Sequence, residues 1–230
     1  DMENDGVPSC MFHKMKKKAF PAATELCQVG VCYDGSDPNA VSDTQPIVDL
    51  SKGEVASDTG ELYRSWVKRY GTVDSPKTKC VYGRLAKNGE IVLSDLKVKC
   101  RNDYAVIALS SLNNDLDIPN TDAMLLTTVS NAVNTGMVIS DDVPGTEQPK
   151  TALMGMPPYQ KLEDFGTAPI LCEVVDAEIA IRTEKLMTVK AISAEGLVIG
   201  SVPVTYEDGW MKFTVGGIKV PSIYYLIQAR

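Results

Sequence analysis

Histidine is almost missing from this chain, which has His13 and no other histidine among its 230 residues. A Ser-His-Asp or Cys-His mechanism needs an oriented imidazole as its base, so any such site would have to use His13. His13 lies in the basic run 11–18, which offers no neighbouring group to orient the ring. Catalytic zinc sites are mostly built on two or three histidines. The sequence therefore argues against a histidine-based hydrolase and against a zinc hydrolase.

Long apolar runs and a positive net charge are also missing. No apolar stretch approaches the roughly 20 residues that span a bilayer, and no basic start followed by an apolar stretch indicates a signal peptide. The 23 Lys and Arg are outnumbered by 30 Asp and Glu, which gives a formal net charge of −7. Nucleic-acid binding rests largely on neutralising phosphates. The sequence thus predicts neither a nucleic acid nor a membrane as partner.

Cysteine is scarce and irregularly spaced. The 6 cysteines include no C-x-x-C pair, which argues against a structural zinc site and against a thioredoxin-type motif. Cys80 and Cys100 belong to segments with strand character, and we expect them either as core thiols or as a disulfide.

What the chain does contain is a succession of short β-type runs from about residue 47. The segments 96–100 and 177–182 alternate polar and apolar residues, as strands wet on one face do, and 104–109 is continuously apolar, as in a central strand. Asn88-Gly89 is the strongest hairpin signal, and Asp208-Gly209 predicts another turn. Helical periodicity is almost absent. We therefore predict an all-β, jelly-roll-like β-sandwich, built as one body or as two stacked β-modules.

Composition shifts predict four segments. Residues 1–50 form an irregular N-terminal segment, and 51–140 form a first β-module. Residues 141–165 are rich in Pro and Gly and form a linker or long loop, and 166–230 form a second β-module.

Several stretches, in this order, resemble one family. They are 57–62, 72–78, 105–112, 125–129, 134–137 and 166–173, followed by the C-terminal strands. Together they resemble the non-catalytic β-rich region downstream of the catalytic (β/α)₈ barrel in multidomain bacterial glycoside hydrolases, over about residues 47–228. The resemblance implies a secreted, extracellular parent that degrades polysaccharide, with this chain as an ancillary or carbohydrate-binding module beside a catalytic domain. It carries no catalytic residue onto this sequence.

A sugar-binding sandwich needs exposed aromatic rings that stack on pyranose faces, with polar neighbours for the hydroxyls. Trp66 lies in a polar surrounding, and on a strand it would share a charged face with Arg64 and Lys68. Tyr63 and Tyr70 flank this run. We predict Trp66, Tyr63, Tyr70 and Arg64 as ligand-binding residues, against the alternative that Trp66 packs on a neighbouring loop or domain.

A second aromatic group follows the Asp208-Gly209 turn. Strand alternation places Trp210 and Lys212 on one face, and Tyr206 precedes the turn. We predict Trp210 and Tyr206 as further ligand-binding residues, against the alternative that Trp210 clamps the second module.

Paired carboxylates occur in polar turns, where both members are solvated alike, so they offer no catalytic acid and nucleophile with separated pKa values. We predict no catalytic residue and no certain cofactor. Asn113, Asp115 and Asp117 supply oxygen ligands for a structural Ca²⁺, although the EF-hand glycine and terminal Glu are missing.

The sequence thus leads to a non-catalytic carbohydrate-binding or ancillary module, with a plant cell-wall glucan, xylan or mannan and an adjacent catalytic domain as partners. Two alternatives stay open: a purely structural module that braces a catalytic barrel, and a small two-carboxylate glycosidase.

Overall fold

The computed structural model describes residues 47–49, 51–140, 161–216 and 221–230. His13, nearly all of the expected N-terminal segment 1–50 and most of the expected linker 141–165 lie outside the described residues. The chain divides into two compact units, 1–63 and 64–230. The first contains the hairpin of β1 (Ile47–Asp49) and β2 (Glu54–Ala56), and the boundary falls within β3 (Leu62–Ser65). The second unit contains the sandwich described below.

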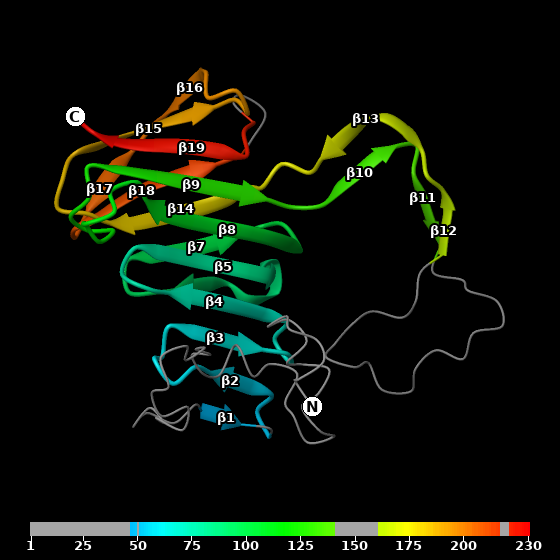
Figure 1. Cartoon of the computed structure of the whole chain (residues 1–230), viewed down its shortest axis with the longest axis horizontal. Coiled ribbons are helices and arrows are strands. Elements are labelled where there is room, and N and C mark those ends of the chain that lie inside the picture. The colour runs from blue at the N-terminus through cyan, green and yellow to red at the C-terminus, as the bar shows by residue number, and fades with distance from the viewer. Residues whose placement is uncertain (1–46, 50, 141–160, 217–220) are drawn as a thin grey trace, which may run out of the picture. The chain divides into compact units, whose positions relative to one another are not determined.

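The larger sheet of the second unit is antiparallel, with the strand order β4-β5-β8-β9-β19-β15-β16 (Figure 1). Its strands, in that order, are Tyr70–Asp74, Thr78–Arg84, Tyr104–Ser111, Ala123–Val129, Tyr224–Ala229, Met187–Ile192 and Val198–Val202.

The smaller sheet has the order β17-β18-β14-β7-β6. Its strands, in that order, are Thr205–Glu207, Trp210–Val215, Ala177–Arg182, Leu96–Cys100 and Glu90–Val92. Within the described residues, no helix is long and apolar enough to cross a membrane.

The two sheets bury their apolar faces against each other. In the larger sheet, Ile107, Leu126 and Ile227 are completely buried, and Ile181 and Met211 of the smaller sheet belong to the same core cluster. Alternate residues of these strands point outward, which is the pattern expected of a sandwich. The all-β, β-sandwich prediction is confirmed.

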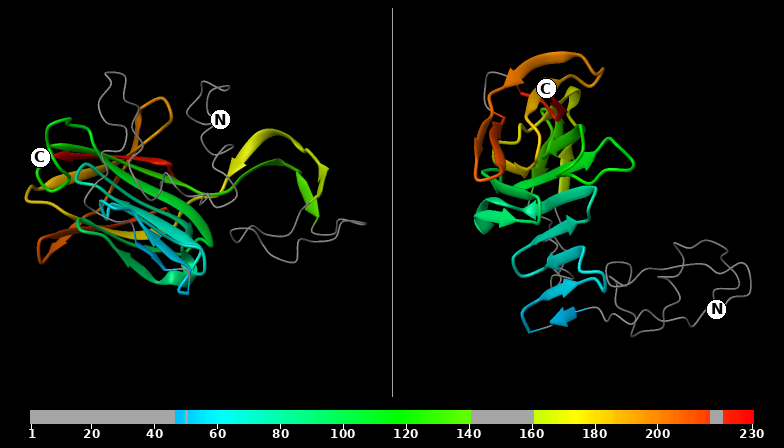
Figure 2. Two further views of the ribbon diagram at one scale, coloured as in Figure 1. Left: turned by 60° about the horizontal axis from the view of Figure 1, so that its bottom comes forward. Right: turned by 90° about the vertical axis from the view of Figure 1, so that its left-hand side faces the viewer.

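The sheets interleave early and late parts of the chain (Figures 1 and 2). Strand β19 lies between β9 and β15, and β14 lies between β7 and β18. The ranges 51–140 and 166–230, expected as β-modules, therefore supply strands to the same two sheets and share one core. Strands from each range form their hydrogen bonds with, and bury their apolar face against, strands from the other range.

One predicted hairpin is wrong. Asn88-Gly89 does not join two paired strands, because β5 belongs to the larger sheet and β6 to the smaller one. The short 3-10 helix η3 (Ala86–Asn88) precedes Gly89, whose positive φ of 66° lets the chain cross between the sheets. Asp208 and Gly209 do form the predicted β17–β18 turn, with φ of 51° and 78°. Two positive φ values match the twist of a two-residue hairpin.

Cys80 and Cys100 are free thiols, so the disulfide alternative does not occur. Both are at least partly buried, and this burial raises the pKa of the Cys80 thiol to about 11. The burial of Cys100 likewise raises the pKa of its thiol.

A charged cluster lies between the sheets at one end of the core. The Lys79 side chain on β5 is 2% exposed, and its Nζ lies 2.7 Å from Asp74 Oδ1 and 3.1 Å from Asp95 Oδ2. It also donates to Ser94 Oγ at 2.6 Å. Asp74 and Lys79 come from the larger sheet, whereas Ser94 and Asp95 form the β6–β7 turn. A buried ammonium needs such partners to compensate its lost hydration.

The remaining strands form a narrow two-stranded arm. Strand β10 (Ala132–Thr135) pairs with β13 (Thr167–Cys172), and β11 (Val138–Ser140) pairs with β12 (Lys161–Asp164). All residues of β12 and β13 are exposed. At the base of the arm Glu173 accepts hydrogen bonds from the side chains of Ser130, Asn102 and Asn131.

Candidate functional site

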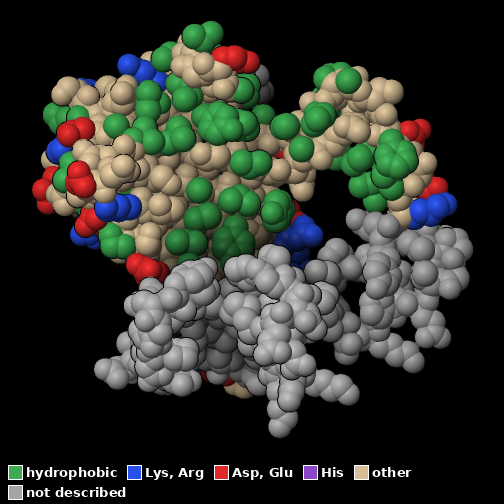
Figure 3. Space-filling model, in the orientation of Figure 1, with side chains coloured by type: hydrophobic (Ala, Val, Ile, Leu, Met, Phe, Trp, Pro, Cys, Tyr) green, Lys and Arg blue, Asp and Glu red, His purple; other side chains and the backbone are tan. Residues whose placement is uncertain are grey.

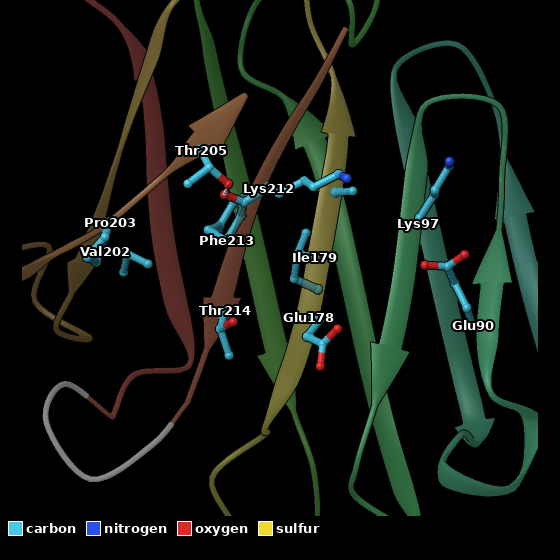
Figure 4. A pocket seen from close by; sticks show the side chains of 11 residues that line it. Glu90, Lys97, Glu178, Ile179, Val202, Pro203, Thr205, Lys212, Phe213 and Thr214 are labelled. Carbon is cyan, nitrogen blue, oxygen red and sulfur yellow. Dashed lines mark hydrogen bonds between the residues drawn. The ribbon is translucent and has the colours of Figure 1, made fainter. Parts of the chain in front are cut away.

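A shallow groove of about 720 Å³ lies mainly over the outer face of the smaller sheet (Figure 4). Most of its outward-pointing lining residues are charged or carry hydroxyl groups. They are Glu90, Lys97, Glu178, Thr205, Lys212 and Thr214, with Ala180 among them and Val202 and Pro203 at the edge. The buried Ile179 and Phe213 also line it.

The strand register explains how these side chains meet. Glu90, Glu178 and Thr214 lie in one row across β6, β14 and β18, and Lys99 of β7, which does not line the groove, stands in that row between the two acids. Side chains that are cross-strand partners point to the same face of a sheet. This row therefore alternates acid, lysine, acid and hydroxyl across the outer face.

The next row contains the smallest side chain of the groove. Ala180 on β14 lies opposite Lys97 on one neighbouring strand and opposite Lys212 on the other, and Thr205 follows beyond Lys212. Two long side chains thus flank a methyl group. Ala180 therefore forms the floor of the groove, and the side chains of Lys97 and Lys212 form its two sides.

Ion pairs occupy several of the charges on this face. Lys212 pairs with Glu207, and this hydrogen bond lowers the pKa of Glu207 and raises that of Lys212. Glu178 pairs with Arg101, which also bonds Asp176 Oδ1 at 2.6 Å. Glu207 and Glu178 are therefore both held by cations of the same protein.

Trp210 lies on this outer face together with Lys212, as the alternation predicts, but its ring is covered. The residue is only 8% exposed. Lys97 Nζ lies 4.3 Å from the ring centroid, and the guanidinium carbon of Arg182 lies 4.9 Å from it. Both distances are within the range of cation–π attraction. In this arrangement the ring offers little free surface for stacking.

Tyr206 points to the opposite face from Trp210. It lies opposite the buried Met211 in the β17–β18 ladder. Its hydroxyl accepts a hydrogen bond from Met187 N–H at 2.6 Å and donates to Met187 O at 3.1 Å. Because Met187 belongs to β15, Tyr206 ties the smaller sheet to the larger one.

The aromatic group around Trp66 differs from the expectation. Strand β3 ends at Ser65 and residues 66–69 form a turn, so Arg64, Trp66 and Lys68 do not share a strand face. Lys68 N–H donates to Ser65 Oγ at 3.1 Å, which helps to close this turn. Arg69 adopts a positive φ of 58° there. The expectation of a common face for Trp66, Arg64 and Lys68 is wrong.

The other members of that group have separate surroundings. Tyr63 ends the first unit on β3 and is half-buried, while Tyr70 opens β4 and packs against the core of the sandwich. Trp66 is half-buried and is not among the groove-lining residues. The groove therefore includes none of Tyr63, Arg64, Trp66 or Tyr70.

The predicted calcium ligands lie in the loop between β8 and β9. Asn113 Oδ1 accepts a hydrogen bond from Asp115 N–H at 2.9 Å, and the backbone oxygen of Asp117 accepts from Asn120 and Thr121. These bonds shape the loop as successive turns. Among the described residues, no group of three or more His, Cys, Asp or Glu side chains is placed to hold a metal ion.

Sequence reasoning missed Lys97, Glu178 and Ala180 as groove residues. Their alternation showed that they point to solvent, but the groove depends on β7, β14 and β18 being neighbours, although far apart in sequence. Comparisons with protein-family models, with curated proteins and with solved structures find no match for this chain.

Proposed function

We propose that this chain is a non-catalytic carbohydrate-binding module of a secreted glycoside hydrolase that degrades polysaccharide. The observation that carries the proposal is the groove of the smaller sheet, which sets carboxylates, ammonium groups and hydroxyls around a small floor at Ala180. The carboxylates accept and the ammonium groups donate, so neighbouring sugar hydroxyls find both kinds of partner. The resemblance of about residues 47–228 to such modules supports the same function.

The groove suits binding better than bond cleavage. Its two carboxylates, Glu90 and Glu178, are both exposed, and Glu178 pairs with Arg101. A glycosidase acid instead lies in an enclosed apolar surrounding that keeps it protonated. Release of sugar by the purified chain, abolished by Glu178→Gln, would support the two-carboxylate glycosidase instead.

The test is calorimetry of the chain with oligosaccharides of glucan, xylan and mannan and with acidic oligosaccharides. Ala180→Trp fills the floor of the groove and should abolish binding. The matched control is Ala108→Trp, which places the same side chain on the outer face of the larger sheet, opposite Thr127 on β9. The proposal fails if no saccharide of the panel binds or if Ala180→Trp binds as the parent chain does.

A second candidate function is structural: a module that braces a neighbouring catalytic domain. It is favoured by exposed apolar side chains on the arm, where Phe165 is 73% and Ile170 is 66% exposed. Figure 3 shows hydrophobic side chains gathered on the arm and over the outer face of the larger sheet. An isolated two-stranded ribbon is only marginally stable in water, so a covering surface would stabilise the arm.

Hydrogen exchange distinguishes this structural role. The amides of β10 and β13 should exchange fast in the isolated chain and slowly in the larger polypeptide that the role requires. Equal exchange in both would count against the brace and leave saccharide binding unaffected.

A further inference from the structure

The ring of Trp210 carries two cations at once. It belongs to β18, while Arg182 lies opposite it on β14 and Lys97 comes from β7, one strand further. Since Ala180 is the residue of β14 that lies opposite Lys97, little side-chain volume separates β7 from β18 at this level. The charged ends of Lys97 and Arg182 thus converge within 4.3 and 4.9 Å of one ring centroid.

These two cations are poorly neutralised by the carboxylates of the same face. Glu207 pairs with Lys212, and Glu178 pairs with Arg101. Asp95 pairs with the buried Lys79 at 3.1 Å, and its other oxygen lies 3.8 Å from Arg182 Nε.

Lys97 has even less compensation. In the part of the chain that the structure describes, it has no ion pair with any carboxylate. Two acids line the groove with it, Glu90 and Glu178, and Glu178 pairs with Arg101. The positive charges of Lys97 and Arg182 repel each other because both lie close to the Trp210 ring. The repulsion is relieved by an anion between them.

We propose that the groove selects an acidic saccharide, whose carboxylate binds where the groove ends at Lys97, between Lys97 and Arg182 beside Trp210. Of these three residues Lys97 lines the groove, and Arg182 and Trp210 lie next to it on the same outer face. This inference rests on the proposed function, because it names the class of sugar that the same groove takes. The guanidinium of Arg182 presents a planar pair of donors that matches a carboxylate. Lys97 adds an ammonium group from β7.

Binding would also change the surroundings of the ring. A carboxylate that draws Lys97 and Arg182 toward itself uncovers Trp210, and the uncovered ring can stack on the pyranose that carries the carboxylate. A neutral sugar lacks the charge that attracts the two cations, so it leaves the ring covered. One residue trio thus recognises both the charge and the ring of a uronic acid.

The experiment compares an oligogalacturonide with its methyl ester, which has the same chain length and ring structure but carries a methyl group on each carboxyl and no charge. We expect the free acid to bind roughly tenfold more tightly, since a charge-assisted bond is worth at least that factor. Lys97→Met and Arg182→Met should each remove the preference, and added salt should weaken it. The matched control is Lys99→Met, which removes a lysine from the same outer face of β7 and should leave the preference unchanged.

Tryptophan fluorescence gives an independent readout. In a Trp66→Phe background the emission of Trp210 should change on addition of the free acid and stay constant with the ester. If acid and ester bind equally, the inference is overturned while saccharide binding stands. If neither these nor the other oligosaccharides bind, the proposed function falls as well.

Discussion

Lys79 Nζ lies 2.7 Å from Asp74 Oδ1 although the lysine side chain is only 2% exposed. Lys79→Met keeps the length of the side chain but leaves Asp74 and Asp95 without their shared cation. Removing one partner of a buried pair costs about 3 kcal/mol. Urea unfolding should show this loss of stability.

The matched control for this change is Lys87→Met, on the exposed 3-10 helix η3, which should alter stability by less than about 0.5 kcal/mol. A Lys79→Met variant as stable as the parent chain would show that the ion cluster contributes nothing.

The same cluster predicts acid sensitivity. Burial raises the pKa of Asp74, but hydrogen bonds from Lys79 and Ser94 outweigh it and hold the pKa below the ordinary 3.8. A carboxyl with a lower pKa in the folded state stabilises the fold above about pH 4, and the contribution is lost as pH falls through the folded pKa. Unfolding free energies measured from pH 6 downward should fall less steeply for Asp74→Asn. Asp115→Asn, in the exposed loop, should retain the parent slope.

Tyr206→Phe should weaken the fold rather than ligand binding. The change removes the hydroxyl that bonds both backbone groups of Met187 and leaves that buried residue with fewer partners. The expected cost is about 1–2 kcal/mol, measured by thermal unfolding. Tyr104→Phe, on an exposed tyrosine of β8, is the control. Lost saccharide affinity with unchanged stability would instead support the prediction that Tyr206 binds the ligand.

The described cysteines should react at very different rates. Cys172 is exposed on the arm, whereas burial raises the pKa of the Cys80 thiol to about 11 and keeps it protonated at neutral pH. Because the thiolate is the nucleophile, maleimide should label Cys172 fast, the half-buried Cys80 slowly and the buried Cys100 only after unfolding. Peptide mass mapping at successive times resolves each site. Labelling of Cys80 as fast as that of Cys172 would contradict the raised pKa of the half-buried Cys80 thiol.

Substitutions at two glycines with positive φ distinguish the cost of backbone strain from the cost of a steric clash. A Cβ at Gly83 would lie 2.4 Å from Arg69 O, while one at Gly89 would meet nothing within 4 Å. Both alanine variants must adopt a positive φ that L-residues rarely take, which costs about 1–3 kcal/mol, but only Gly83→Ala must also displace backbone at the start of β4. Its melting temperature should fall clearly further than that of Gly89→Ala. Equal losses would mean that φ alone matters at both positions.

Local patterns in the sequence predicted the sandwich well. Alternation identified the wet and dry faces of β7 and β14, and Asp208-Gly209 located a hairpin, because these features depend on neighbours in the chain. The hairpin predicted at Asn88-Gly89 is wrong for a physical reason. A glycine with positive φ serves a crossover between sheets as well as it serves a hairpin.

The groove was beyond prediction because it depends on sheet order. Lys97 and Trp210 are distant in sequence, and only the pairing of β14 with both β7 and β18 brings the lysine over the ring. The exposed aromatic face expected at Trp210 was covered by cations that no local pattern connects to it.

The place of β19 between β9 and β15 has a consequence for synthesis on the ribosome. Strand β9 is synthesised well before its partner β19. Until β19 is made, the backbone N–H and C=O groups on that edge of β9 are unpaired and can bind other chains. Deleting residues 224–230 would split the larger sheet in its interior instead of trimming a margin. Truncated forms of this chain should therefore collect in inclusion bodies.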